Sequence, residues 1–159
     1  MNTHVPETQF APGREIELER EGLFARLTAA FMHRDFLAFN EAVREDVVME
    51  LPGSSWLAGT HEGRDAFGRF MVSVRQVVYS SKRPTTYLHS ADEMIARHDM
   101  LVSGPKHEVE MVLVIKIRFD TAGMVAAVVV VPEDLGLFDH VANSTRKYFQ
   151  AVEAALTAL

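Results

Sequence analysis

Residues 50–71 read ELPGSSWLAGTHEGRDAFGRFM, and this stretch decides the fold because it joins the end of a strand to the start of a long helix. The Pro52-Gly53 pair cannot continue a strand ladder, so the preceding strand is predicted to end there. The turn that follows carries Trp56, the single tryptophan of the chain. We predict that this stretch forms the rim of a pocket. Trp56 either stacks over a ligand at the mouth or packs in the core beneath its own loop.

The composition is that of one ordinary globular domain. The chain has 159 residues, of which 48% are hydrophobic and 24% are charged, and this length suits a single core. A net charge of -6 argues against nucleic acid as a partner. The chain has no cysteine, which excludes disulfides and thiolate metal sites and is compatible with a reducing cytoplasm. The sequence shows neither a leader nor the ~18 unbroken apolar residues of a membrane span, so we expect a cytoplasmic protein without a membrane partner.

Helical periodicity dominates both ends of the chain. Apolar residues recur at spacings of three, four and seven, and acidic or hydroxyl residues such as Asp35 and Ser144 are placed to cap helices. The expected helices cover residues 14–32, 36–43, 63–78, 134–141 and 144–159, and the third of them starts at Gly63 or at Thr60. Residues 1–13, which contain two prolines, are expected to form a flexible arm. We therefore divide the chain into this arm, a domain over 14–142 and a C-terminal helical extension over 143–159.

The middle of the chain is predicted to form a curved antiparallel sheet. Strands are expected over residues 46–51, 85–90, 94–103, 107–120 and 124–131. The last four are joined by short connections rich in turn residues, which suit antiparallel hairpins. An α+β layout follows, with the N-terminal helices packed on the sheet. The last strand is apolar on both faces, which predicts that the back of the sheet is covered, by a second subunit or by the C-terminal helix.

Two segments carry a family resemblance. The sequence DVVMELPGSSWLAGTHEGRDAF at 46–67 and the hairpin IRFDTAGMV at 117–125 resemble the SnoaL-like polyketide-cyclase branch of the nuclear transport factor two-like superfamily. The resemblance covers about residues 18–139. It implies a cone-shaped α+β barrel with a deep apolar cavity, commonly a homodimer packed through the sheet. The superfamily includes isomerases, dehydratases, epoxide hydrolases and many non-enzymes, so the resemblance implies a cavity and no particular reaction.

The resemblance does not carry over a complete catalytic set. In ketosteroid isomerase, a carboxylate at the end of the first strand moves the proton and a neutral Asp on a later strand donates a hydrogen bond to the oxyanion. Matching the 117–120 hairpin puts Ile115 at the second position and Leu51 or Glu50 at the first. Because Ile115 offers no donor, this route is not expected here.

The histidine at position 98 is the leading candidate for a catalytic base. His98 shares a strand face with apolar residues, and a neutral imidazole in such surroundings can act as a base near pH 7; it can equally be satisfied by a neighbouring hydroxyl or carbonyl group without any reaction. If the opposite strand face points inward, Arg97 and Asp99 take its place. That pair has the spacing found in the superfamily's epoxide hydrolases, but a valine near Val130 replaces their partner acid. Glu50 is the second acid/base candidate if it faces the cavity, and a solvated surface residue otherwise.

Aromatic and apolar side chains are expected to complete the substrate site. The predicted contact residues are Trp56, Phe67, Met71, Tyr87, Met100, Leu113 and Ile115. Tyr87 and His89 share a strand face and can meet one ligand or face solvent at an edge. The histidines lack metal-binding spacing and no phosphate-binding glycine motif occurs, so neither a metal nor a cofactor is expected.

The sequence therefore predicts a SnoaL-like small-molecule protein. As an enzyme it would be a cofactor-independent isomerase, cyclase or hydrolase that acts by proton transfer on a small apolar substrate. The alternative is a non-catalytic ligand-binding or dimerisation module, whose interior is filled by side chains such as Phe67, Met71, Met100 and Met111.

Overall fold

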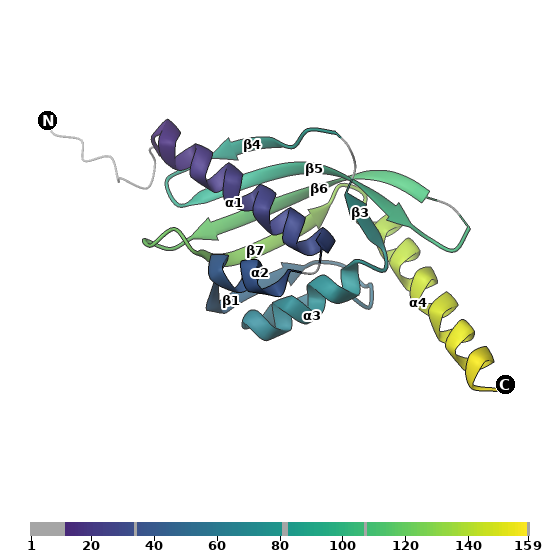
Figure 1. Ribbon diagram of the computed structural model, residues 1–159. Coiled ribbons are helices and arrows are strands. Elements are labelled where there is room, and N and C mark those ends of the chain that lie inside the picture. The colour runs from purple at the N-terminus through teal and green to yellow at the C-terminus, as the bar shows by residue number, and fades with distance from the viewer. Residues whose placement is uncertain (1–11, 34, 81–82, 107, 159) are drawn as a thin grey trace, which may run out of the picture.

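The computed structural model describes residues 12–33, 35–80, 83–106 and 108–158 (Figure 1). Its helices are α1 (Arg14–His33), α2 (Phe36–Ala42), α3 (Arg64–Val74) and α4 (Leu135–Thr157). Its strands are β1 (Val43–Leu51), β2 (Gly59–Glu62), β3 (Val78–Ser80), β4 (Thr86–His89), β5 (Glu93–Ser103), β6 (Glu108–Phe119) and β7 (Val125–Pro132). The predicted α+β class is confirmed. Of the predicted arm, residues 1–11 lie outside the part of the chain that the structure describes.

The strands form one curled sheet in the order β2-β1-β7-β6-β5-β3, with β4 also paired to β5. The antiparallel β4, β5, β6 and β7 were predicted, but β2 and β3 were not. Val78 was assigned to the end of a helix, whereas α3 ends at Val74 and Val78 begins β3. β1 pairs with β7 in parallel, a long-range contact for which the sequence carries no local signal.

Three helices cover the inner face of this sheet, as Figure 1 shows for α1, α2 and α3. The alternation along β6 gives the physical reason: Met111, Leu113, Ile117 and Phe119 are buried under the helices, while Glu110, Lys116 and Arg118 lie on the other face. Residues on alternate positions of a strand point to opposite faces. The core therefore lies between the sheet and the three N-terminal helices, as expected.

The C-terminal region is one helix and not the two that were predicted. Asp134 caps α4 by accepting a hydrogen bond from the Leu137 N–H at 3.0 Å. Ser144 does not cap a helix, because its hydroxyl donates to the backbone oxygen of His140 inside α4. The predicted boundary at residue 143 thus falls within a continuous helix. None of the described helices is long and apolar enough to span a membrane.

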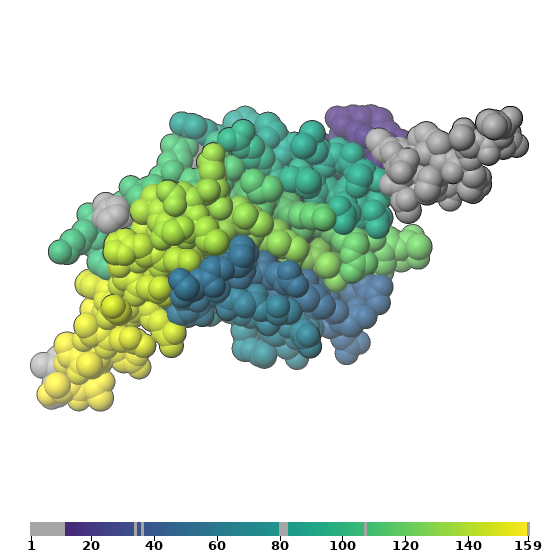
Figure 2. All heavy atoms as spheres, turned by 180° about the vertical axis from the view of Figure 1, so that it is seen from behind, coloured from purple at the N-terminus to yellow at the C-terminus, as the bar shows by residue number. Residues whose placement is uncertain are grey.

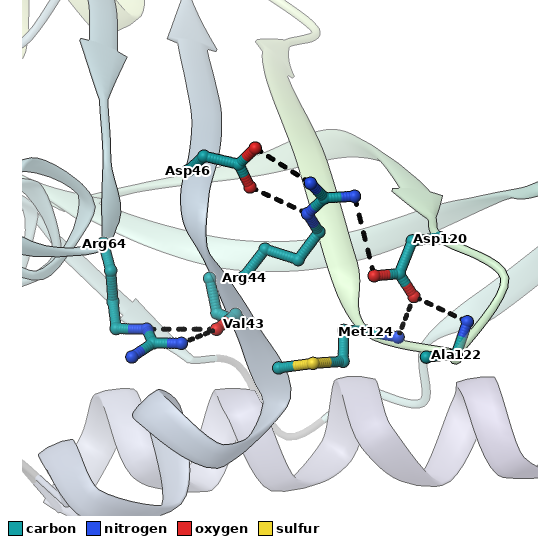
Figure 3. Close-up of polar contacts among 7 residues, drawn as sticks. All are labelled: Val43, Arg44, Asp46, Arg64, Asp120, Ala122 and Met124. Carbon is teal, nitrogen blue, oxygen red and sulfur yellow. Dashed lines mark hydrogen bonds and ion pairs between the residues drawn. The ribbon is translucent and has the colours of Figure 1, made fainter.

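Polar contacts fasten the start of β1 to its neighbours (Figure 3). The Arg44 guanidinium bonds to Asp46 at 2.7 Å and lies 3.6 Å from Asp120, whose carboxylate also accepts two backbone hydrogen bonds within the β6–β7 turn. The Arg64 side chain donates two hydrogen bonds to the Val43 oxygen, at 3.0 and 2.7 Å. The register of β1 with β7 shifts between Val43 and Val48, so these contacts hold an irregular stretch of the strand in place.

Candidate active site

An apolar cavity lies between the inner face of the sheet and the helices α1, α3 and α4. Its volume is about 120 Å³, which is close to the ~150 Å³ of an apolar cavity that holds benzene. The predicted contact residues that line it are Phe67, Met71, Met100, Leu113 and Ile115. These side chains come from α3, β5 and β6. Met71 and Met100 form part of its wall, and the volume lies between them and the other lining side chains.

His98 is the titratable group in the lining of this cavity. It lies opposite Leu113 in the β5–β6 ladder, and it is 6% exposed. Its Nδ1 is 2.6 Å from the Thr85 hydroxyl, and its ring meets the Phe24 ring edge-on at 5.8 Å. Burial lowers the pKa of His98 and the charge of Asp99 raises it to a smaller extent. The imidazole is therefore neutral at pH 7.

Arg97 and Asp99 lie on the opposite face of β5 from His98. Arg97 is exposed, and the Asp99 carboxylate is 3.9 Å from the Arg83 guanidinium. Because successive residues of a strand alternate in direction, placing His98 inside requires both neighbours to be outside. The arrangement suited to an epoxide hydrolase is thus not present in the cavity.

Glu50 does not face the cavity, so of the two alternatives that the sequence left open the structure has the solvated surface residue and not the inward-facing acid. It is exposed and pairs with Val129 of β7 on the outer side of the sheet. Its neighbours Met49 and Leu51 are buried, and Leu51 lines the cavity. Strand alternation from Leu51 therefore directs the Glu50 carboxylate to solvent.

The tryptophan loop lies outside the lining of the cavity, whereas Leu51, Phe67, Phe70 and Met71 from the same stretch line it. The prediction made from residues 50–71 is therefore corrected for the loop alone. The Trp56 indole N–H donates to the Ala142 oxygen at 2.9 Å, and its backbone N–H donates to the Asn143 side chain at 3.0 Å. The Arg146 guanidinium lies 5.3 Å from the centre of the indole ring. Trp56 thus fastens its loop to α4 and does not contact the cavity.

A buried acid that the sequence analysis missed completes this attachment. The Asp139 carboxylate, 9% exposed, accepts hydrogen bonds from the N–H groups of Ser54 and Ser55 at 2.9 and 3.1 Å and from the Ser54 hydroxyl at 3.2 Å. Gly53 has a φ of +107°, and a Cβ there would be 2.6 Å from the carboxylate oxygens. The adjacent Phe138 lines the cavity, so this attachment positions part of the cavity wall. The signal for Asp139 in the sequence was an acidic residue on the apolar face of a helix.

Tyr87 lies beneath α1 and outside the lining of the cavity. Its ring meets the Phe24 ring edge-on at 5.8 Å and stacks on His89 at 6.3 Å. Burial raises the pKa of Tyr87, while the nearby Thr85 hydroxyl lowers it to a smaller extent. The His89 ring is 3.7 Å from the Glu21 carboxylate. Tyr87 therefore contacts Phe24, which lines the cavity, and lies beside Thr85, which holds His98.

Two kinds of site residue were not predicted. Thr85, which holds His98, stands just before β4 and has no motif around it. The side chains of Phe24, Leu27 and Phe31 contribute a wall from α1, although the sequence indicated only that this helix covers the sheet. Among the described residues no group of three or more His, Cys, Asp and Glu is placed to hold a metal ion.

Comparison with known structures identifies the fold. No family model and no curated protein matches the sequence. An NTF2-like protein from Burkholderia xenovorans superposes with a TM-score of 0.69 at 19% identity, covering 79% of this chain and 97% of that one. TerC, co-crystallised with polyporic acid, gives 0.66 at 17% identity, covering 79% and 98%. A candidate polyketide cyclase from Xanthomonas campestris gives 0.63 at 15%, covering 80% and 98%. The chain therefore has the NTF2-like fold.

Proposed function

We propose that the cavity binds a small apolar molecule and that the His98 imidazole is the polar group that contacts it. One observation carries this proposal: a buried histidine, held by Thr85, lies in a wall otherwise formed by apolar side chains and Thr28. The Thr28 hydroxyl donates to the Phe24 oxygen of its own helix. A fitting ligand is largely apolar and carries one hydrogen-bonding oxygen, as a ketone, enol or phenol does.

Proton transfer is the chemistry that such a site favours. A neutral imidazole can accept or release a proton near pH 7, and the pKa of His98, lowered by burial, keeps it in the neutral form. The contact with Thr85 orients the ring. We propose a cofactor-independent isomerase, cyclase or hydrolase of the SnoaL-like kind with His98 as the base. TerC, which was co-crystallised with polyporic acid, and the candidate polyketide cyclase from Xanthomonas support a small organic molecule as the substrate.

Filling the cavity tests where the ligand binds. Val130 lines the cavity, whereas its neighbour Val131 is 41% exposed on the outer face. Val130→Phe is expected to abolish binding of enolisable ketones and epoxides in ligand-observed NMR, and Val131→Phe is the matched control with unchanged binding. Binding that survives Val130→Phe places the ligand elsewhere.

Replacement of His98 tests the chemistry. His98→Ala is expected to lower turnover of an active ketone by about 10²-fold or more, the range for loss of a general base. Thr85→Val is expected to lower it less, with Thr85→Ser close to the parent, because the serine hydroxyl can still reach His98. Turnover retained by His98→Ala removes this residue from the mechanism.

Binding without catalysis is the second candidate function, and one observation favours it. No Asp or Glu of the described chain lines the cavity, so this lining supplies no carboxylate as a second acid/base group. A sequestering protein would bind the same ketones with the same sensitivity to Val130→Phe, yet it would show no turnover that depends on His98.

We also propose that a second copy of the chain covers the outer face of the sheet. Val112, Val114 and Val129 are partly exposed there and Val131 is exposed, and an unpaired apolar sheet face favours association. Val114→Lys is expected to weaken this contact in sedimentation velocity. The proposed location is the cytoplasm, whose reducing conditions suit a chain without cysteine.

A further inference from the structure

The second half of α4 extends beyond the body of the protein. Every described position from Arg146 to Ala158 is exposed, and Figures 1 and 2 show this segment projecting away from the sheet. At 1.5 Å per residue the projection from Arg146 to Thr157 is about 18 Å long. The segment continues the packed first half of α4, yet none of its described side chains is buried, so its surface is available to a partner.

The projecting segment keeps the apolar face on which the first half of α4 packs. Phe138, Ala142 and Thr145 follow spacings of four and three residues, and all three are buried. The same alternation continues through three exposed side chains, which are Phe149 (46%), Val152 (39%) and Leu156 (66%). An alternation of three and four is the heptad pattern of helices that pair with another helix. We call Phe149, Val152 and Leu156 the α4 stripe.

The α4 stripe borders an open surface groove. Gln76, which follows α3, forms part of this groove together with the stripe and the adjacent Glu153 and Thr157. No described segment of the chain occupies the groove. A second helix that packs on the stripe would lie along it.

We propose that the α4 stripe pairs with the α4 stripe of a second copy, with the two helices antiparallel about a two-fold axis. The charged residues beside the stripe indicate both which partner binds there and in which direction its helix runs. Arg146 and Glu153 are seven residues apart and therefore lie on the same edge of the helix. In an antiparallel pair, this edge of one helix faces the same edge of the partner helix. Arg146 of one copy then lies opposite Glu153 of the other. A parallel pair does not bring these opposite charges together.

The position of the axis follows from this charge pairing. The midpoint between Arg146 and Glu153 falls next to Phe149, so the two Phe149 rings meet near the axis and the two Leu156 side chains lie far from it. The contact is small, because it uses one stripe from each copy and falls below the ~1,200 Å² of a stable interface. The dimer is therefore weak and depends on concentration. It is independent of the proposed ligand and of the outer sheet face.

Sedimentation velocity of the full chain over a concentration series tests the pairing. Val152→Glu places a charge in the stripe and is expected to raise the dissociation constant at least about tenfold. Val72→Glu is the matched control, since Val72 is similarly exposed (48%) on α3. Val114→Lys distinguishes association through the sheet. A monomer at every concentration, or association unaffected by Val152→Glu, overturns the proposal.

Two further measurements address the direction of the helices. Glu153→Arg is expected to weaken association, and adding Arg146→Glu is expected to restore it. Arg146→Glu alone is the control for loss of the contact between Arg146 and Trp56 within one chain. Because the chain has no cysteine, single replacements can be oxidised cleanly: Phe149→Cys is expected to form a disulfide-linked dimer and Leu156→Cys is not. Equal cross-linking of both overturns the antiparallel arrangement. A monomer that binds phosphatidylglycerol vesicles through the stripe would identify a membrane as the occupant and would also overturn it.

Discussion

Two buried polar side chains of nearly equal exposure serve different purposes in this molecule. His98 is 6% exposed and Asp139 is 9% exposed. The Asp139 carboxylate is surrounded by N–H and hydroxyl donors of the tryptophan loop, so its bonds join two segments of the chain. The His98 ring has Thr85 at Nδ1 and also borders a cavity. Burial alone does not identify a functional group; the neighbouring space does.

Removal of the Asp139 carboxylate is expected to have the largest effect on stability. Asp139→Ala leaves the Ser54 and Ser55 N–H groups without their acceptor and is expected to cost about 3 kcal/mol of unfolding free energy. Urea unfolding, followed by the fluorescence of Trp56 in the same loop, measures it. Asp134→Ala is the graded control, since it removes one capping bond of α4 and costs about 1 kcal/mol. Equal losses for the two variants would contradict the special role of Asp139.

The close approach of Gly53 to Asp139 gives the next largest effect. Gly53→Ala is expected to cost about 2 kcal/mol, because it combines a positive φ with a clash against the carboxylate. Gly59→Ala separates the two causes, since Gly59 has a φ of +120° but no atom within 4 Å of the place that a Cβ would occupy. It is expected to cost about 1 kcal/mol. The same urea experiment compares the two glycine variants. An equal loss of unfolding free energy would mean that the positive φ, and not the clash with Asp139, is the sole cause.

The His98 side of the comparison predicts a pH dependence of stability. The pKa of His98 is lowered in the folded protein, so the unfolded chain binds its proton more readily. The contribution of His98 is fully present above the ordinary pKa near 6.5 and is lost as the pH falls through the folded value. His98→Gln is expected to reduce the loss of stability between about pH 7.5 and 5. A parent-like slope in His98→Gln would refute the assignment.

Glu50 should give the smallest effect. Its carboxylate is exposed on the outer face, and such substitutions usually change stability by less than about 0.5 kcal/mol. Glu50→Gln is therefore expected to leave both urea unfolding and ketone binding unchanged. Loss of ketone binding in this variant would indicate that Glu50 contacts the ligand. It would contradict the placement of the ligand beside His98 on the inner face of the sheet.

Periodic patterns along the chain predicted much of the fold. The alternation of β6 is a local property, and it indicated correctly which side chains face the core. The apolar spacing of α1 and α3 did so in part, since Ile16 of the predicted α1 stripe is 46% exposed and Val78 lies in β3. Two short strands were not predicted: β2, which has four residues, and β3, which has three. The parallel contact of β1 with β7 depends on segments far apart in the chain, where no local pattern can indicate the partner.

The candidate site likewise has features that the sequence indicated and features that only the structure shows. Strand alternation limited the choice on β5 to His98 or to Arg97 with Asp99, and the residues that line the cavity decided for His98. The same alternation put Glu50 outside once Leu51 was known to face the cavity. The Trp56 loop has the composition of a pocket rim, yet it is bound to α4 by Asp139, which lies 85 residues after Ser54 in the chain.

The amino-acid sequence by itself determined the N-terminal helices, the antiparallel strands β4 to β7 and the apolar face of β6, because these depend on neighbours within a few residues. The tertiary structure alone decided that Thr85 holds His98, that Asp139 fastens the tryptophan loop and that the end of α4 extends into solvent. These features arise when segments distant in the chain meet, and such contacts depend on the packing of the whole sheet.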